Sequence, residues 1–234
     1  MMKLIFACIF FGFITICEAQ DHLEWLKDSQ TDTLYREDQF YAGFSFNFLT
    51  DLPQQVNQSG FSGGLIFGFI RDMPINKRRN VSIGLGLGFN LNTFGQTLKI
   101  SRANTEDTFS VIGSDIDYDS NRFTTNMVQV PLELRWRTSD SSTFAFWRIY
   151  LGLNIGYVFQ SKSIYQGSDE SFEFSSPQGI NNFRTSAKLT FGYGAVNFFV
   201  DASITPIFDE TTAEVLQQEI GIKPIKVGLV FFFL

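Results

Sequence analysis

The chain has 234 residues, a formal net charge of −6, and 28 phenylalanines within a hydrophobic share of 44%. This apolar content excludes a disordered chain, and the acidic balance argues against a nucleic-acid partner because domains that bind nucleic acids carry basic faces. Beyond the N-terminus, no apolar run reaches the ~18 residues that a membrane-spanning helix needs.

Residues 1–19 have the layout of a secretory signal peptide. Lys3 provides the positive charge, residues 4–16 form an apolar stretch that is too short to span a membrane, and Cys17-Glu18-Ala19 supplies small residues for cleavage before Gln20. We therefore expect an exported chain. Cleavage would remove both cysteines, so neither a disulfide nor thiol chemistry is expected in the mature protein.

From Phe40 onward, apolar and polar residues alternate with the two-residue period of β-strands. In residues 81–92, six apolar side chains alternate with serine, glycine and asparagine. The same pattern predicts eight strands, at residues 40–49, 60–70, 81–92, 125–138, 144–159, 183–193, 196–208 and 221–234.

The polar faces of these strands distinguish a membrane barrel from a soluble one. They combine glycine with charged residues, which suits a crowded lumen, whereas glycine on a solvent-exposed face weakens a strand without a gain in packing. Several strands also exceed the usual length in soluble proteins of ~5–6 residues. The sequence therefore predicts an all-β, eight-stranded antiparallel up-and-down outer-membrane β-barrel over residues 39–234, preceded by a periplasmic stem over residues 20–38.

The connections between strands indicate an orientation. Residues 93–124 and 160–182 form long polar loops, which are expected outside the cell, while short turns and both termini are expected in the periplasm. Residues 71–80 depart from this pattern, because they predict a periplasmic turn of ten residues. At the C-terminus, one short motif resembles the signal by which the barrel assembly machinery recognises outer-membrane proteins: Lys226, Gly228, Phe231 and Phe233.

An eight-stranded barrel has a lumen just wide enough to be filled by side chains, so no diffusion pore is expected. The charged residues expected to face this lumen are Glu133, Arg135, Arg137, Arg148, Arg184, Lys188, Asp201 and Lys226. Buried charges need partners, which favours a structural salt-bridge network. A proton or ligand path is the alternative.

Catalytic, metal and cofactor sites are not predicted. The single histidine, His22, lies in the expected stem, so the barrel has no histidine to act as a general base. The acidic string at 115–121 spaces its carboxylates as a calcium loop does, but Ser120 and Asn126 replace the glycine and glutamate of that motif. A solvated acidic loop is favoured, and calcium binding stays open.

Residues 60–80, GFSGGLIFGFIRDMPINKRRN, resemble the PorT family of Bacteroidetes-type bacteria, also called SprT. Further similarity lies at Asp119 to Thr125, Gln129 to Arg137, Phe146 to Tyr150 and Leu229 to Leu234, and the long loops are least alike. The resemblance implies an outer-membrane barrel needed by the type IX secretion system, which exports adhesins and proteases and supports gliding motility. It implies no catalytic or metal residue.

We therefore expect a non-enzymatic accessory of type IX secretion, embedded in outer-membrane lipids. Four basic residues of the turn at 71–80 are candidates for docking an acidic periplasmic surface of another secretion component: Arg71, Lys77, Arg78 and Arg79. Contact of these side chains with lipid headgroups is the alternative. The alternative function is a small barrel of the OmpA or OmpX kind, which anchors the envelope or binds ligands through its outer loops. A lipocalin-like soluble carrier needs an apolar lumen, so the charged residues expected in the lumen of this barrel disfavour that alternative.

Overall fold

The computed structural model describes residues 37–103, 106–113, 115–138, 146–209 and 221–233. Within these ranges, no helix is long and apolar enough to cross a membrane. The strands are β1 (Gln39–Thr50), β2 (Gly63–Pro74), β3 (Val81–Gly95), β4 (Leu98–Ala103), β5 (Glu106–Val111), β6 (Tyr118–Arg137), β7 (Trp147–Gly167), β8 (Ser171–Ser175), β9 (Phe183–Tyr193), β10 (Val196–Ser203) and β11 (Lys223–Phe233).

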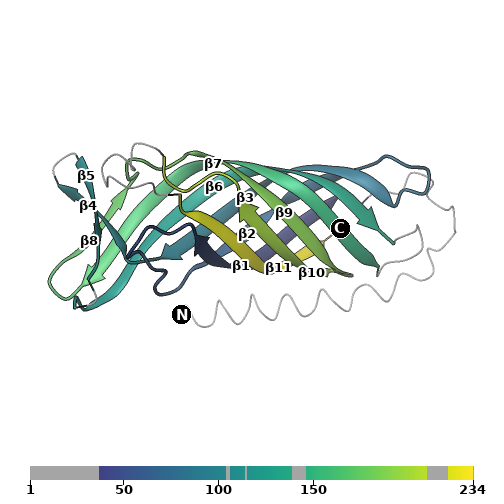
Figure 1. Ribbon diagram of the computed structural model, residues 1–234. Helices are drawn as coiled ribbons and strands as arrows, with labels where there is room; N and C mark the ends of the chain where they lie inside the picture. The colour runs from purple at the N-terminus through teal and green to yellow at the C-terminus, as the bar shows by residue number, and fades with distance from the viewer. Residues whose placement is uncertain (1–36, 104–105, 114, 139–145, 210–220, 234) are drawn as a thin grey trace, which may run out of the picture. The chain divides into compact units, whose positions relative to one another are not determined.

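Eight of these strands form a closed antiparallel barrel (Figure 1), which confirms the predicted fold. The order around the barrel is β6, β3, β2, β1, β11, β10, β9 and β7, and β7 pairs with β6 to complete the circle. β1 begins and β11 ends at the same end of the barrel, which we call the terminal end. We call the opposite end, where β4, β5 and β8 lie, the loop end.

Two of the predicted strand boundaries were wrong by seven or eight residues. β6 begins at Tyr118 instead of residue 125, and β7 continues to Gly167 instead of ending at residue 159. The long loops also contain a separate β4–β5 hairpin and a short strand, β8, that pairs with β7. In these outer segments both faces of each strand carry polar residues, so the alternation that marks a strand in the sequence disappears. The predicted strand at 196–208 is shorter in the structure, where β10 ends at Ser203.

The outer face of the barrel is an apolar belt. Leu87 and Leu153, for example, are 55% and 45% exposed, and aromatic side chains lie near both edges of the belt. From Trp147 to Phe159, twelve residue steps of ~3.3 Å along a strand tilted by ~40° span roughly 30 Å. This height matches the hydrocarbon core of a bilayer.

The loop end contains an apolar core inside the barrel wall. Its buried residues come from both barrel strands and loops: Leu49, Val56, Phe94, Leu98, Ile100, Phe123, Ile180, Ile207, Phe208 and Ile222. The rings of Phe94 and Phe123 stack at 5.4 Å between centroids, and Phe208 contacts Phe123 at 5.9 Å. Folding of the loops over this core closes the loop end with apolar side chains.

An ion pair joins β4 to β5. Arg102 donates from Nε and Nη2 to Asp107 at 2.5 and 2.9 Å, and the backbone N–H of Gln178 donates to the same carboxylate at 2.6 Å. Burial acts to raise the pKa of the Asp107 carboxyl, but these hydrogen bonds outweigh it and hold that pKa below its ordinary value. The hairpin is thereby tied to the loop that precedes β9.

Replacing Leu153 by arginine should lower the free energy of unfolding by about 2–4 kcal/mol, because Leu153 lies midway along the belt that is predicted to face lipid. The measurement is a guanidinium titration of the protein in phospholipid vesicles, followed by tryptophan fluorescence. Gln166→Arg is the control, since Gln166 is exposed on the same strand beyond the belt. Equal losses for the two variants would contradict a lipid-facing position for Leu153.

Candidate functional site

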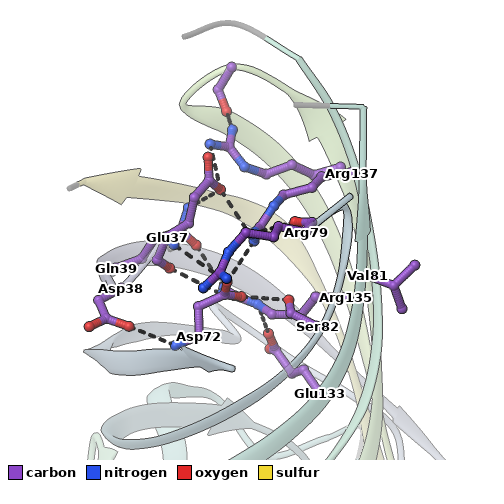
Figure 2. Close-up of polar contacts among 12 residues, drawn as sticks. Glu37, Asp38, Gln39, Asp72, Arg79, Val81, Ser82, Glu133, Arg135 and Arg137 are labelled. Atoms are coloured by element: carbon purple, nitrogen blue, oxygen red, sulfur yellow. Dashed lines mark hydrogen bonds and ion pairs between the residues drawn. The ribbon is translucent and has the colours of Figure 1, made fainter. Parts of the chain in front are cut away.

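A network of buried charged side chains occupies the lumen at the terminal end (Figure 2). At its centre, the carboxylate of Asp72 accepts hydrogen bonds from Nη1 of Arg135 at 3.2 Å and from Nη1 of Arg137 at 2.9 Å. These three side chains have no exposed surface. The hydroxyl of Ser82 donates to the same carboxylate at 2.6 Å. One carboxylate is therefore shared as the ion-pair partner of two buried guanidinium groups.

The two-residue period of β6 places the cations of this network. Glu133, Arg135 and Arg137 point into the lumen, while the residues between them face outward. Glycines on neighbouring strands make room for these long side chains. A Cβ atom on Gly84 would lie 2.8 Å from Cδ of Arg135, and one on Gly152 would lie 2.8 Å from Cγ of Glu133. The sequence therefore places glycines among the inward positions because the long charged side chains need the space.

The residues just before β1 complete the network. The carboxylate of Glu37 lies 3.8 Å from Nη1 of Arg137 and 3.6 Å from Nη2 of Arg148, and it accepts a hydrogen bond from Gln39 at 3.2 Å. Gln39 in turn accepts one from Arg135 at 2.7 Å. The sequence interpretation assigned Glu37 to the stem and missed this role, because one acidic residue ahead of a strand carries no pattern.

Toward the middle of the barrel, Glu133 links the network to β9. Its two carboxylate oxygens lie 3.2 Å from Nε of Arg135 and 3.3 Å from Nζ of Lys188. Asp201 forms a second group, accepting from Asn154 at 2.7 Å and lying 3.9 Å from Nζ of Lys226. Lys188, Asp201 and Lys226 are neighbours in register on β9, β10 and β11, so the two groups form a continuous row of charged side chains in the lumen.

Arg184 lies nearer the loop end and bonds to the backbone. It donates to the carbonyl oxygens of Asn181 at 3.2 Å and Ile207 at 3.5 Å. Among the described lumen residues, six cationic side chains face four carboxylates: Arg135, Arg137, Arg148, Arg184, Lys188 and Lys226 against Glu37, Asp72, Glu133 and Asp201. Backbone carbonyls and aromatic rings supply further partners. The guanidinium of Arg135, for example, lies 4.3 Å from the centroid of the Tyr150 ring.

The expected ten-residue turn at 71–80 is wrong, because β2 and β3 remain paired up to Pro74 and Ser82. Six residues, 75–80, form the connection. Arg71 is exposed on the outer face of β2, while Asp72 points into the lumen.

The remaining basic residues of the turn differ in exposure. Lys77 and Arg78 are exposed, and Arg79 is half-buried. The carbonyl oxygen of Arg79 accepts a hydrogen bond from Nη2 of Arg137 at 2.9 Å, so the turn is tied to the lumen network. This contact brings the exposed basic residues and the buried charges together at the terminal end.

The C-terminal motif lies on β11, next to β1. Lys226 is buried in the lumen, while Phe231 and Phe233 lie on the outer face, where Phe231 pairs with Ala42 and Phe233 with Phe40. Gly228 approaches β1 closely, since a Cβ atom there would lie 1.9 Å from the carbonyl oxygen of Phe44.

The acidic string at 115–121 lies at the loop end. Asp115, Asp117 and Asp119 are exposed. In the part of the chain that the structure describes, no group of three or more histidine, cysteine, aspartate or glutamate residues is placed to hold a metal ion.

A family model described as outer membrane protein beta-barrel domain matches residues 28–209, which covers all of the barrel except β11. A search of the curated proteins found no match.

Replacing Asp72 by asparagine should lower the free energy of unfolding by roughly 3–5 kcal/mol, because it leaves two buried guanidinium groups without their shared carboxylate. Guanidinium titration in vesicles measures this loss. Asp115→Asn is the control, since Asp115 is exposed. The double variant Asp72→Asn, Arg137→Met should recover part of the stability. A stability equal to that of the control variant would contradict the central role of Asp72.

In planar lipid bilayers, the purified protein should give no ion conductance above that of the bilayer alone. The buried charged side chains and the apolar core at the loop end together fill the lumen. Stable open-channel currents would show instead that the lumen side chains move apart in the membrane.

Proposed function

Because the chain belongs to the outer membrane protein beta-barrel domain family and folds as a closed barrel, we propose that it is a non-enzymatic accessory of type IX protein secretion and the associated gliding motility. The protein is an outer-membrane β-barrel. In this proposal a signal peptide directs its export, both termini lie in the periplasm and the loop end faces outward. It acts by binding another secretion component at the terminal end.

One observation carries the proposal. The segment that joins the buried network to the exposed basic turn, residues 72–80, lies within the string at 60–80 that resembles the PorT family. Asp72 holds Arg135 and Arg137, and the following turn presents Lys77 and Arg78 to solvent. Because the resemblance includes this exposed turn, it favours a function in which the turn contacts another component.

The packed lumen supports an accessory role. Six buried cations and four carboxylates occupy the space through which a cargo would have to pass. Opening that space would separate buried ion pairs, which costs several kcal/mol for each pair broken. The proposal therefore assigns the translocation of cargo to other components.

The composition of the barrel supports the absence of enzymatic activity in this proposal. The only histidine and both cysteines of the chain precede residue 37. Carboxylates of the lumen such as Asp72 and Glu133 form ion pairs with arginine and lysine side chains inside the closed barrel, which favours a structural role for them over catalysis.

The surface of the loop end favours one alternative. β6 and β7 continue beyond the belt, β8 pairs with β7, and the β4–β5 hairpin is tied to this region by Arg102. Such an ordered surface suits a small barrel of the OmpA or OmpX kind that binds a ligand through its outer loops.

Replacing Lys77 and Arg78 by serine in the native host should lower cargo secretion several-fold, because the turn loses the two exposed charges that would attract an acidic partner. Secreted cargo is measured in the culture medium. Heat-modifiable mobility in gels should stay normal, since neither side chain is buried in the lumen.

The control removes the same charge at the loop end, with Arg122→Ser and Lys223→Ser, and should leave secretion unchanged. Normal secretion by the Lys77→Ser, Arg78→Ser variant would contradict docking at the turn. Loss of secretion in the control alone would assign the contact with the secretion system to the loop end and contradict docking at the turn.

A further inference from the structure

A hollow of about 670 Å³ lies on the outer face of the barrel near the loop end, across β1, β2, β3, β6 and β7. We call it the outer groove. Phe44, Phe46 and Phe61, which are 42%, 58% and 70% exposed, form one side of it. Asn126, Gln160 and Lys162 are among the residues of the other side.

The groove forms because Gly63 occupies an outward position between Phe46 on β1 and Thr93 on β3. The next three outward positions of β2 carry the large apolar side chains of Leu65, Phe67 and Phe69. The missing side chain admits the ring of Phe61, since a Cβ atom on Gly63 would lie 2.6 Å from Cζ of that ring. Phe61 therefore lies beside the outer wall, with the tip of its ring next to Gly63, and is not part of the loop core.

The side of the groove formed by β6 and β7 is polar. A shift of register between Asn126 and Met127 leaves Phe159 without a paired residue and turns Gln160 and Lys162 outward. The side-chain amide of Asn126 donates to Oε1 of Gln160 at 2.8 Å. Nearer the terminal end, the outward positions of β2, β3 and β6 carry apolar side chains instead: Phe67, Phe89 and Val128, which are neighbours in register.

The chemistry of the two sides selects the ligand. A simple anion is disfavoured, because Glu173 lies 2.6 Å from Nζ of Lys162 and neutralises it. Amides and threonine hydroxyls instead match the donors and acceptors of sugar hydroxyls, and an exposed aromatic ring packs against the apolar face of a sugar. Phe44 and Leu65 continue the groove into the belt, where an acyl chain would lie.

The width of the groove exceeds one sugar ring. Gly63, Thr93, Thr124 and Lys162 are neighbours in register across four strands, and three inter-strand steps of ~4.8 Å give about 14 Å. We propose that the outer groove binds a lipid with a disaccharide headgroup. Its sugars contact Phe61, Asn126 and Gln160, and its acyl chains lie along the apolar residues of β1 and β2. This inference rests on the proposed function in one respect only, which is that the loop end faces outward from the cell.

Native mass spectrometry of the full chain in detergent tests this inference independently of secretion. The probes are digalactosyl diacylglycerol, which has no phosphate, and phosphatidylglycerol, which has no sugar. We expect the protein to retain the glycolipid about tenfold better, a ratio that one or two net hydrogen bonds supply. Equal retention of the two lipids, or better retention of phosphatidylglycerol, would overturn the assignment.

Two variants locate the binding site. Asn126→Leu with Gln160→Leu extends the apolar belt across the groove, and Phe61→Ala removes the aromatic surface from an exposed loop position. Each should lower glycolipid retention about tenfold. Val130→Leu is the control, because Val130 faces outward on β6 away from the groove. Unchanged retention in both groove variants would show that the lipid binds elsewhere and would refute the proposal.

Discussion

The structure depends on the two-residue period of its strands within a closed ring of eight. Closure pairs the backbone groups of every barrel strand, and the period divides the side chains between a lumen and an outer belt. An eight-stranded ring leaves a lumen that side chains can fill. The inward residues must therefore be small where a long neighbour crosses the lumen, as Gly84 is beside Arg135. The outward residues must be apolar wherever lipid contacts the wall.

The two ends of the barrel close by different means. At the terminal end, Asp72 and Glu37 hold three arginines in a network without exposed acidic groups. At the loop end, an apolar core that includes Phe94, Phe123 and Phe208 excludes water. Polar partners with fixed geometry suit a site where the chain enters the barrel, because they hold residues 37–39 in one position. Burial of apolar area suits the loop end, where segments of several loops meet without a common register.

The functional proposals concern surfaces and not the lumen. The basic turn lies beyond the terminal edge of the belt, and the outer groove lies where the belt becomes polar near the loop end. Both follow from local departures from the regular barrel. The turn at 75–80 is longer than the two-residue connection between β9 and β10, and the groove arises from one glycine and one shift of register. A barrel with a filled lumen is left with its surfaces for contacts with other molecules.

The sequence alone determined the fold class, because the alternation of apolar with glycine and charged residues survives in every barrel strand. It also identified the lumen charges from Glu133 to Lys226, since period two assigns each residue to one face. It did not identify Glu37 or Asp72, which lie outside the predicted strands. The bond between Asp72 and Arg135 joins residues 63 positions apart, and only closure of the barrel brings them together. The strand extensions at 118–124 and 160–167 could not be predicted either, because both of their faces carry polar side chains and show no alternation. They become strands through their pairing with each other in the folded barrel.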